Sequence, residues 1–146
     1  MKNDIYATLS IYSKKITAEQ ITHKLGLAPH KSWIKGNRKV LLNRKTGERR
    51  ILPAVHKEHL WELKSKSSST ISLDVPVRQL LIRLKPYSKM IKRLSAQPNV
   101  NVQLSGVIYW YQDSTPPLNF KKEILRAIND LGASLDLDLY MLGGEK

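Results

Sequence analysis

The segment Leu135-Asp136-Leu137-Asp138-Leu139-Tyr140 decides the fold of this chain. Side chains of a β-strand repeat every two residues, so its three leucines share one face and Asp136, Asp138 and Tyr140 share the other. Gly132, just before this segment, is typical of the left-handed residue that ends a helix. The sequence therefore predicts a helix that leads into a strand, buried on its leucine face and carrying carboxylates on the other.

Similar patterns outside this segment predict two more strands and two helices. Residues Asp4–Ser13 and Val100–Tyr111 alternate apolar with polar side chains, as half-buried strands do. A capping box that begins at Thr17 predicts a helix over Ala18–Leu25, and helical spacing of apolar residues predicts another over Phe120–Leu131. A further strand is expected over residues 59–65.

Two insertions interrupt this series, a basic hairpin at about residues 34–58 and a helical pair at about 75–96, broken at Pro86. Without them, two strand–helix–strand units remain. The chain is therefore expected to form a single α+β domain over residues 1–146, a ferredoxin-like sandwich with its helices on one face. Right-handed crossovers would place the first strand beside Val100–Tyr111 at the centre of the sheet. The uncovered face would carry Tyr6, Tyr12, Tyr109, Tyr111, Asp136, Asp138 and Tyr140.

Charge is distributed unevenly along the 146 residues, whose formal net charge is +13. Residues 31–66 hold eleven Lys and Arg against three Glu, whereas residues 101–146 hold four basic and six acidic residues. A field of this sign attracts polyanions or an acidic protein. The chain has no cysteine, which excludes disulfides and thiolate metal sites and favours a reducing compartment. With no signal pattern or membrane span visible, we expect a cytoplasmic protein.

Several short motifs occur along the chain: Thr17-Ala18-Glu19-Gln20-Ile21, Leu25-Gly26-Leu27-Ala28-Pro29, Trp33-Ile34-Lys35-Gly36, Trp61-Glu62-Leu63 and the stretch from Leu131 to Tyr140. Together they resemble the bacterial domain of unknown function 4279 family. The resemblance covers about Tyr6 to Tyr140. It implies one domain and assigns no activity.

The hairpin is the first candidate binding site, because it gathers many cations on a short segment. These are Lys35, Arg38, Lys39, Arg44, Lys45, Arg49 and Arg50. Such a density is typical of a phosphate-binding arm or of a surface that docks an acidic protein. The alternative is a solvated loop that binds nothing.

The uncovered sheet face is the second candidate. Its five tyrosines could stack nucleic-acid bases, as aromatic residues do in RNA-recognition domains, although tyrosine also favours strands by propensity alone. They are Tyr6, Tyr12, Tyr109, Tyr111 and Tyr140. The Cα atoms of Asp136 and Asp138 are expected to lie ~6.5–7 Å apart, a spacing that would allow an acid/base pair. No nucleophile or metal cluster accompanies them, so a structural or recognition role is predicted, for instance holding an arginine of the hairpin over the sheet.

No catalytic residue, metal site or cofactor is predicted. His56 and His59 offer two imidazoles, whereas metal sites need three or more ligands in fixed geometry. We therefore expect a non-catalytic binding protein that engages nucleic acid or another polyanion through the hairpin and the tyrosine face. The alternative is a protein–protein partner, such as an immunity or adaptor protein that docks an acidic target.

Overall fold

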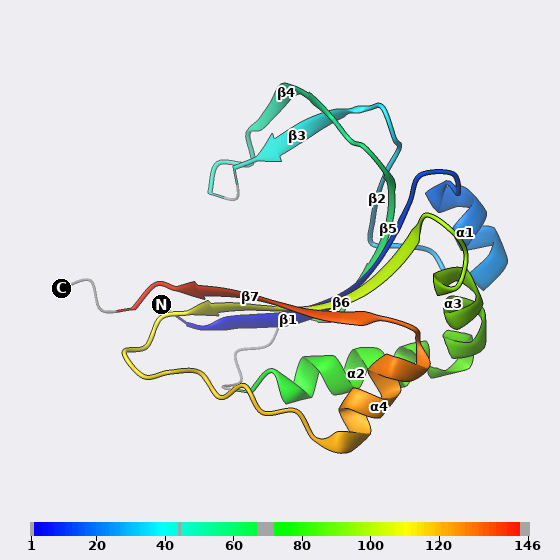
Figure 1. Ribbon diagram of the computed structural model, residues 1–146. Helices are drawn as coiled ribbons and strands as arrows, with labels where there is room; N and C mark the ends of the chain where they lie inside the picture. The colour runs from blue at the N-terminus through cyan, green and yellow to red at the C-terminus, as the bar shows by residue number, and fades with distance from the viewer. Residues whose placement is uncertain (1, 44, 67–71, 144–146) are drawn as a thin grey trace.

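The computed structural model describes residues 2–43, 45–66 and 72–143. Its centre is a five-stranded sheet in the order β2-β5-β1-β6-β7, with helices covering one face (Figure 1). The strands are β1 (Asp4–Ser13), β2 (Lys31–Trp33), β5 (His59–Lys64), β6 (Val100–Trp110) and β7 (Ser134–Met141). The α+β class predicted from the sequence is confirmed, and β2 is the strand that the sequence analysis missed.

The helical layer consists of α1 (Ala18–Leu25), α2 (Asp74–Leu84), the short 3-10 helix η1 (Lys85–Tyr87), α3 (Ser88–Ser95) and α4 (Lys122–Asp130). The capping box of α1 is present, since Thr17 Oγ1 accepts from the Gln20 N–H and the Gln20 side chain accepts from the Thr17 N–H. Pro86 lies in η1 and separates α2 from α3, as predicted. None of these helices has the length and apolar composition to cross a membrane, within the residues that the structure describes.

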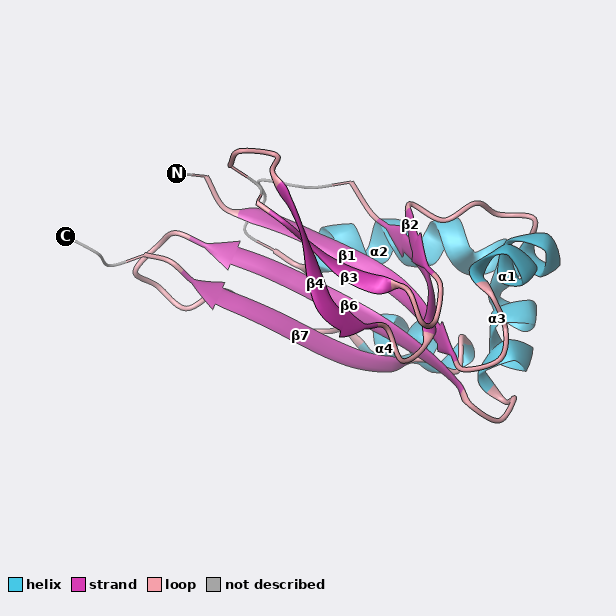
Figure 2. Ribbon diagram, turned by 90° about the horizontal axis from the view of Figure 1, so that it is seen from above, coloured by secondary structure: helices cyan, strands magenta, loops and turns pink. Residues whose placement is uncertain are grey.

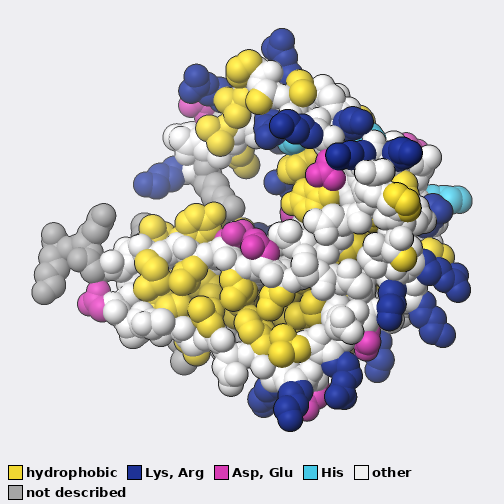
Figure 3. Space-filling model, viewed as in Figure 1, with side chains coloured by type: hydrophobic (Ala, Val, Ile, Leu, Met, Phe, Trp, Pro, Cys, Tyr) yellow, Lys and Arg dark blue, Asp and Glu magenta, His cyan; other side chains and the backbone are white. Residues whose placement is uncertain are grey.

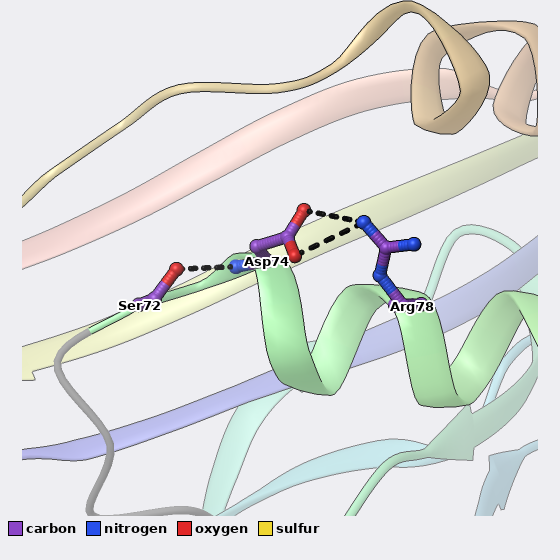
Figure 4. Close-up of polar contacts among 3 residues, drawn as sticks. All are labelled: Ser72, Asp74 and Arg78. Atoms are coloured by element: carbon purple, nitrogen blue, oxygen red, sulfur yellow. Dashed lines mark hydrogen bonds and ion pairs between the residues drawn. The ribbon is translucent and has the colours of Figure 1, made fainter.

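The start of α2 is fixed by local polar contacts (Figure 4). Ser72 Oγ accepts a hydrogen bond from the Asp74 N–H at 3.2 Å, and the Asp74 carboxylate forms an ion pair with Arg78 one turn later, also at 3.2 Å. Pairs of this spacing stabilise an exposed helix by about 0.2–0.5 kcal/mol. The Asp74–Arg78 pair is the one ion pair among the described residues.

The two strands β1 and β6 are arranged as predicted, but the strands on either side of them are not those of a ferredoxin-like sheet. β1 and β6 are antiparallel neighbours over their whole length. β5 lies beside β1, and β7 lies beside β6 in parallel, so α4 connects two adjacent strands. In a ferredoxin-like sheet each strand–helix–strand unit encloses a strand of the other unit. Alternation in a sequence fixes which face a residue occupies and leaves the neighbouring strand undetermined, which explains the difference.

The hydrophobic core lies between the sheet and the helices, and the register of β7 is as predicted. Leu135, Leu137 and Leu139 pair with Leu104, Gly106 and Ile108 of β6 on the helix-covered face. However, Leu137 and Leu139 remain 38% and 40% exposed. The expectation of a fully buried leucine face is therefore wrong for these two residues, because β7 is an edge strand and α4 lies only beneath its beginning (Figure 1).

The last helix also begins later than the sequence predicted. It starts at Lys122 instead of Phe120, and Lys121 occupies the N-cap position without a side-chain hydrogen bond. Gly132 has a φ of +67°, which confirms its predicted role in the turn from α4 to β7.

Candidate binding cleft

Residues 34–58 form an arm that projects from the sheet. Its two strands, β3 (Arg38–Leu42) and β4 (Arg49–Val55), make a separate two-stranded sheet, which confirms the predicted hairpin. At its turn, Asn43 Oδ1 accepts from the N–H groups of Lys45 and Thr46, and Gly47 has a φ of +72°. The arm arches over the sheet face that the helices leave open, as both views of the ribbon show (Figures 1 and 2).

The base of the arm is held by aromatic and imidazole side chains. The Trp33 ring stacks on His56 with centroids 3.9 Å apart, and Trp33 Nε1 donates to the Glu58 carbonyl at 3.0 Å. His59 Nδ1 accepts from the Lys35 N–H at 3.0 Å. The two histidines that the sequence offered as metal ligands thus have structural contacts that position the arm.

Exposed cations and exposed apolar side chains occur together on the arm. Of the predicted cations, Lys35, Arg38, Lys39, Lys45, Arg49 and Arg50 are exposed there, while Arg44 lies outside the described residues. The apolar residues are 46–66% exposed and comprise Val40, Leu41, Leu42, Ile51 and Val55. The sequence predicts these apolar residues only as parts of the hairpin strands. It gives no indication that they gather, exposed, on one uncovered ribbon.

Beneath the arm, the open sheet face is hollowed into a polar pocket of about 510 Å³. Its floor consists of Thr8, Ser10 and Ser105, which are only 2–7% exposed because larger side chains on neighbouring strands surround them. Figure 3 shows the hollow between arm and sheet, with Lys and Arg on the arm and acidic side chains on the sheet below. The pocket and the arm together form the candidate binding cleft.

The two sides of the pocket carry opposite charges. On β5, Lys64 Nζ lies 3.9 Å from the centroid of the Tyr6 ring, and Glu62 Oε1 accepts a hydrogen bond from Ser10 Oγ at 2.9 Å. On β7, Asp136 and Asp138 lie on the same face, and burial and then the Asp136 carboxylate raise the pKa of Asp138. With Lys31 and Lys64 against the single acid Glu62 on one side and two aspartates on the other, the pocket is basic toward β5 and acidic toward β7.

The predicted tyrosine platform is not continuous. Tyr109 and Tyr140 stack in parallel at 4.7 Å near one end of the sheet, whereas Tyr6 is buried beneath Lys64. Tyr12 is half-buried, and this burial raises the pKa of its hydroxyl. Tyr111 follows the last residue of β6, where its N–H donates to Asn3 Oδ1. The prediction of five tyrosines on one accessible surface is therefore wrong.

The predicted ion pair between the arm and the sheet does not form among the described residues. Asp136 and Asp138, the acids expected to hold the arginine, interact with each other instead. Burial raises the pKa of Asp138, and the charge and hydrogen bond of Asp136 raise it further. This carboxyl pair therefore opposes folding when both groups are ionised.

We expect Asp138→Asn to raise the thermal midpoint of unfolding at pH 7. The native pKa of Asp138 lies above the unfolded value of about 3.9. Ionisation of Asp138 therefore begins to destabilise the folded state as the pH rises above the unfolded pKa, and the destabilisation is complete once the pH exceeds the native pKa. The gain should therefore vanish at about pH 3, where the carboxyl is protonated in both states. Thermal unfolding followed by circular dichroism at both pH values measures this effect. Asp113→Asn, in an exposed loop, is the charge-matched control; an equal gain in both variants would contradict the explanation.

A comparison with family models matches residues 3–142 to the family described as Domain of unknown function (DUF4279). The chain belongs to this family. No curated protein and no solved structure matches it. The DUF4279 match spans the sheet, the helices and the arm, so all parts of the candidate cleft lie within the family domain.

Proposed function

We propose that this DUF4279 chain is a non-catalytic binding protein whose arm docks an acidic protein. The observation that carries the proposal is the combination of exposed apolar and cationic side chains on a ribbon that packs against little of its own chain. An immunity or adaptor protein is the kind of protein that acts in this way. The absence of cysteine supports a reducing compartment, such as the cytoplasm, as its location.

The composition of the arm supports a protein partner. A two-stranded hairpin alone is marginally stable in water, and apolar side chains gathered on a surface mark interaction sites. Protein interfaces combine an apolar centre with a polar rim and are enriched in arginine. On the arm, Val40 and Ile51 are directly opposite each other, and Arg49 and Arg50 lie beside them on β4. The cations would steer an acidic partner toward the arm, and the apolar residues would be buried on contact.

Nucleic acid is the second candidate, favoured by the stacked pair of Tyr109 and Tyr140 on the open face and by the same cations. Bases stack on such aromatic surfaces, and the arm could follow the phosphates. Against this candidate, Asp136 and Asp138 lie on the same face and would repel phosphate groups.

A catalytic role is not proposed. The Ser10 hydroxyl donates to Glu62 and is only 2% exposed, so a substrate has little access to it as a nucleophile. Catalysis by a serine requires a hydroxyl that an adjacent base activates toward an accessible substrate atom. Asp136 and Asp138 interact with each other on β7, and we do not assign them as an acid/base pair.

Charge reversal on the arm tests the proposal. We expect the variant Lys45→Glu, Arg49→Glu, Arg50→Glu to bind the native partner about 100-fold more weakly, or about 2.7 kcal/mol. The control variant Lys89→Glu, Lys92→Glu, Arg93→Glu changes the same number of exposed cations on α3 and should retain binding. Affinity capture from the native host followed by titration with the recovered partner measures both. Equal binding by the two variants would eliminate the arm as the docking site.

A second variant separates the two candidate partners. Val40→Ser with Ile51→Ser removes apolar surface from the arm and leaves all its cations in place. It should weaken binding to a protein and leave binding to nucleic acid nearly unchanged. Nuclease treatment of the lysate, and a steep loss of binding with salt, would identify nucleic acid as the partner instead.

A further inference from the structure

The polar pocket beneath the arm has a charge arrangement that the proposed function does not explain. One row across the sheet runs from Lys64 on β5 through Thr8 on β1 and Ser105 on β6 to Asp136 on β7. A cation thus stands at one end of the row and a carboxylate at the other, with small hydroxyl side chains between them. The volume of about 510 Å³ is within the usual range for small-ligand sites, roughly 300–1,000 Å³.

The register of the strands sets the distance between the two charged ends. Lys64 Nζ leans inward over the ring of Tyr6, and Tyr6 on β1 pairs with Val107 on β6, which pairs with Asp138 on β7. The ammonium is therefore about two strand spacings from the carboxylates, roughly 9–10 Å. An extended peptide of three residues spans at most roughly 10–11 Å.

The chemistry of each end suits one terminus of such a peptide. A pair of adjacent carboxylates, Asp136 and Asp138, can accept charge-assisted hydrogen bonds from an ammonium group. At the other end, Lys64 offers an ammonium to a carboxylate, and Lys31 on β2 lines the same side of the pocket. Glu62 also lines this side, where its carboxylate accepts the hydrogen bond from Ser10 Oγ. Between them, the hydroxyl groups of Thr8 and Ser105 line the path that peptide amides would follow.

We propose that this pocket binds a short zwitterionic peptide of about three residues, with its amino terminus at Asp136 and Asp138 and its carboxylate at Lys64. The small floor residues leave room for the peptide backbone, which lies across the strands. The ammonium of the peptide separates the two like charges on β7, so binding also lowers the pKa of Asp138 toward its ordinary value. This site is independent of the docking surface proposed for the arm.

Calorimetric titration of the full chain with Ala-Ala-Ala tests the proposal. The free tripeptide should bind with a Kd of about 1 mM or below, whereas N-acetylated and C-amidated forms should each bind at least about tenfold more weakly. Ala-Ala should also bind more weakly, because it cannot span both ends. Equal binding of free and blocked peptides, or no binding of the free tripeptide at about 10 mM, would overturn the proposal.

Two variants assign the ends of the peptide. The double variant Asp136→Asn, Asp138→Asn should bind the free and N-acetylated peptides equally, while Lys64→Met should bind the free and C-amidated peptides equally. Lys89→Met on α3 is the control and should bind as the unaltered chain does. The charge-reversed arm should still bind the tripeptide, so failure of the arm's function and failure of this site are distinguishable. Unchanged preferences in both pocket variants would place the peptide elsewhere and refute the assignment.

Discussion

Replacing Trp61 with alanine is expected to lower the free energy of unfolding by about 3–5 kcal/mol, the range found for removing a large buried aromatic side chain. Trp61 lies on β5 and is fully buried. It pairs with Ile11 of β1 on the helix-covered face, and its Nε1 donates to Thr22 Oγ1 of α1 at 3.1 Å. This side chain therefore joins the sheet to α1, and its loss leaves both a cavity and a polar group without its donor.

Urea unfolding followed by far-ultraviolet circular dichroism measures the loss. Trp61→Phe keeps most of the apolar bulk and removes the N–H, so it should cost clearly less than alanine. Thr22→Val, combined with each substitution, isolates the hydrogen bond, whose net contribution is about 0.5–1.5 kcal/mol. A loss below about 1 kcal/mol in Trp61→Ala would contradict the position assigned to this residue.

Gly132→Ala is expected to destabilise the chain by about 2–5 kcal/mol, through two separate effects. The first is the left-handed backbone, at φ +67°, which costs an L-residue roughly 1–2 kcal/mol. The second is a collision, because an added Cβ would lie 2.1 Å from Ser95 Oγ and 2.9 Å from Ser95 Cβ on α3. Overpacking of this kind costs about 1–3 kcal/mol. Urea unfolding measures the sum.

Gly26→Ala is the matched control, since Gly26 has nearly the same φ, +69°, and a Cβ there would meet no described atom within 4 Å. It should show the backbone cost alone, about 1–2 kcal/mol. Adding Ser95→Gly to Gly132→Ala should restore the steric part of the lost unfolding free energy, once the effect of Ser95→Gly alone has been subtracted. Equal losses of unfolding free energy in Gly26→Ala and Gly132→Ala would show that Ser95 on α3 moves aside without cost, and would contradict the steric contribution.

Local patterns predicted individual elements well. The bounds of β1 and α1 follow the sequence prediction, because alternation and a capping box are both determined by neighbouring residues. The face of each β7 side chain was predicted for the same reason. The neighbours of β5 and β7 were not predicted, since these strands are placed by contacts between residues far apart in the sequence.

The candidate site was only partly predictable from the sequence. The cations of the hairpin and the carboxylates of β7 are evident in the sequence, but their meeting across one cleft depends on how the arm is held at Trp33 and His56. Burial of Tyr6 depends on the tertiary position of Lys64. The pocket floor was missed because isolated Ser and Thr residues in a strand give no pattern of their own.

The pairing of β1 with β6 has a consequence for how the chain reaches this fold. Asp4 aligns with Tyr109 and Ser13 with Val100, so the longest strand contact of the molecule joins residues separated by most of the chain. Closing so large a loop delays folding, because its entropy is lost before the contact is gained. During synthesis on the ribosome, β1 can pair with β5 long before β6 emerges. Until then its other edge is open, and an unpaired strand edge of this kind makes an unfinished chain prone to aggregation.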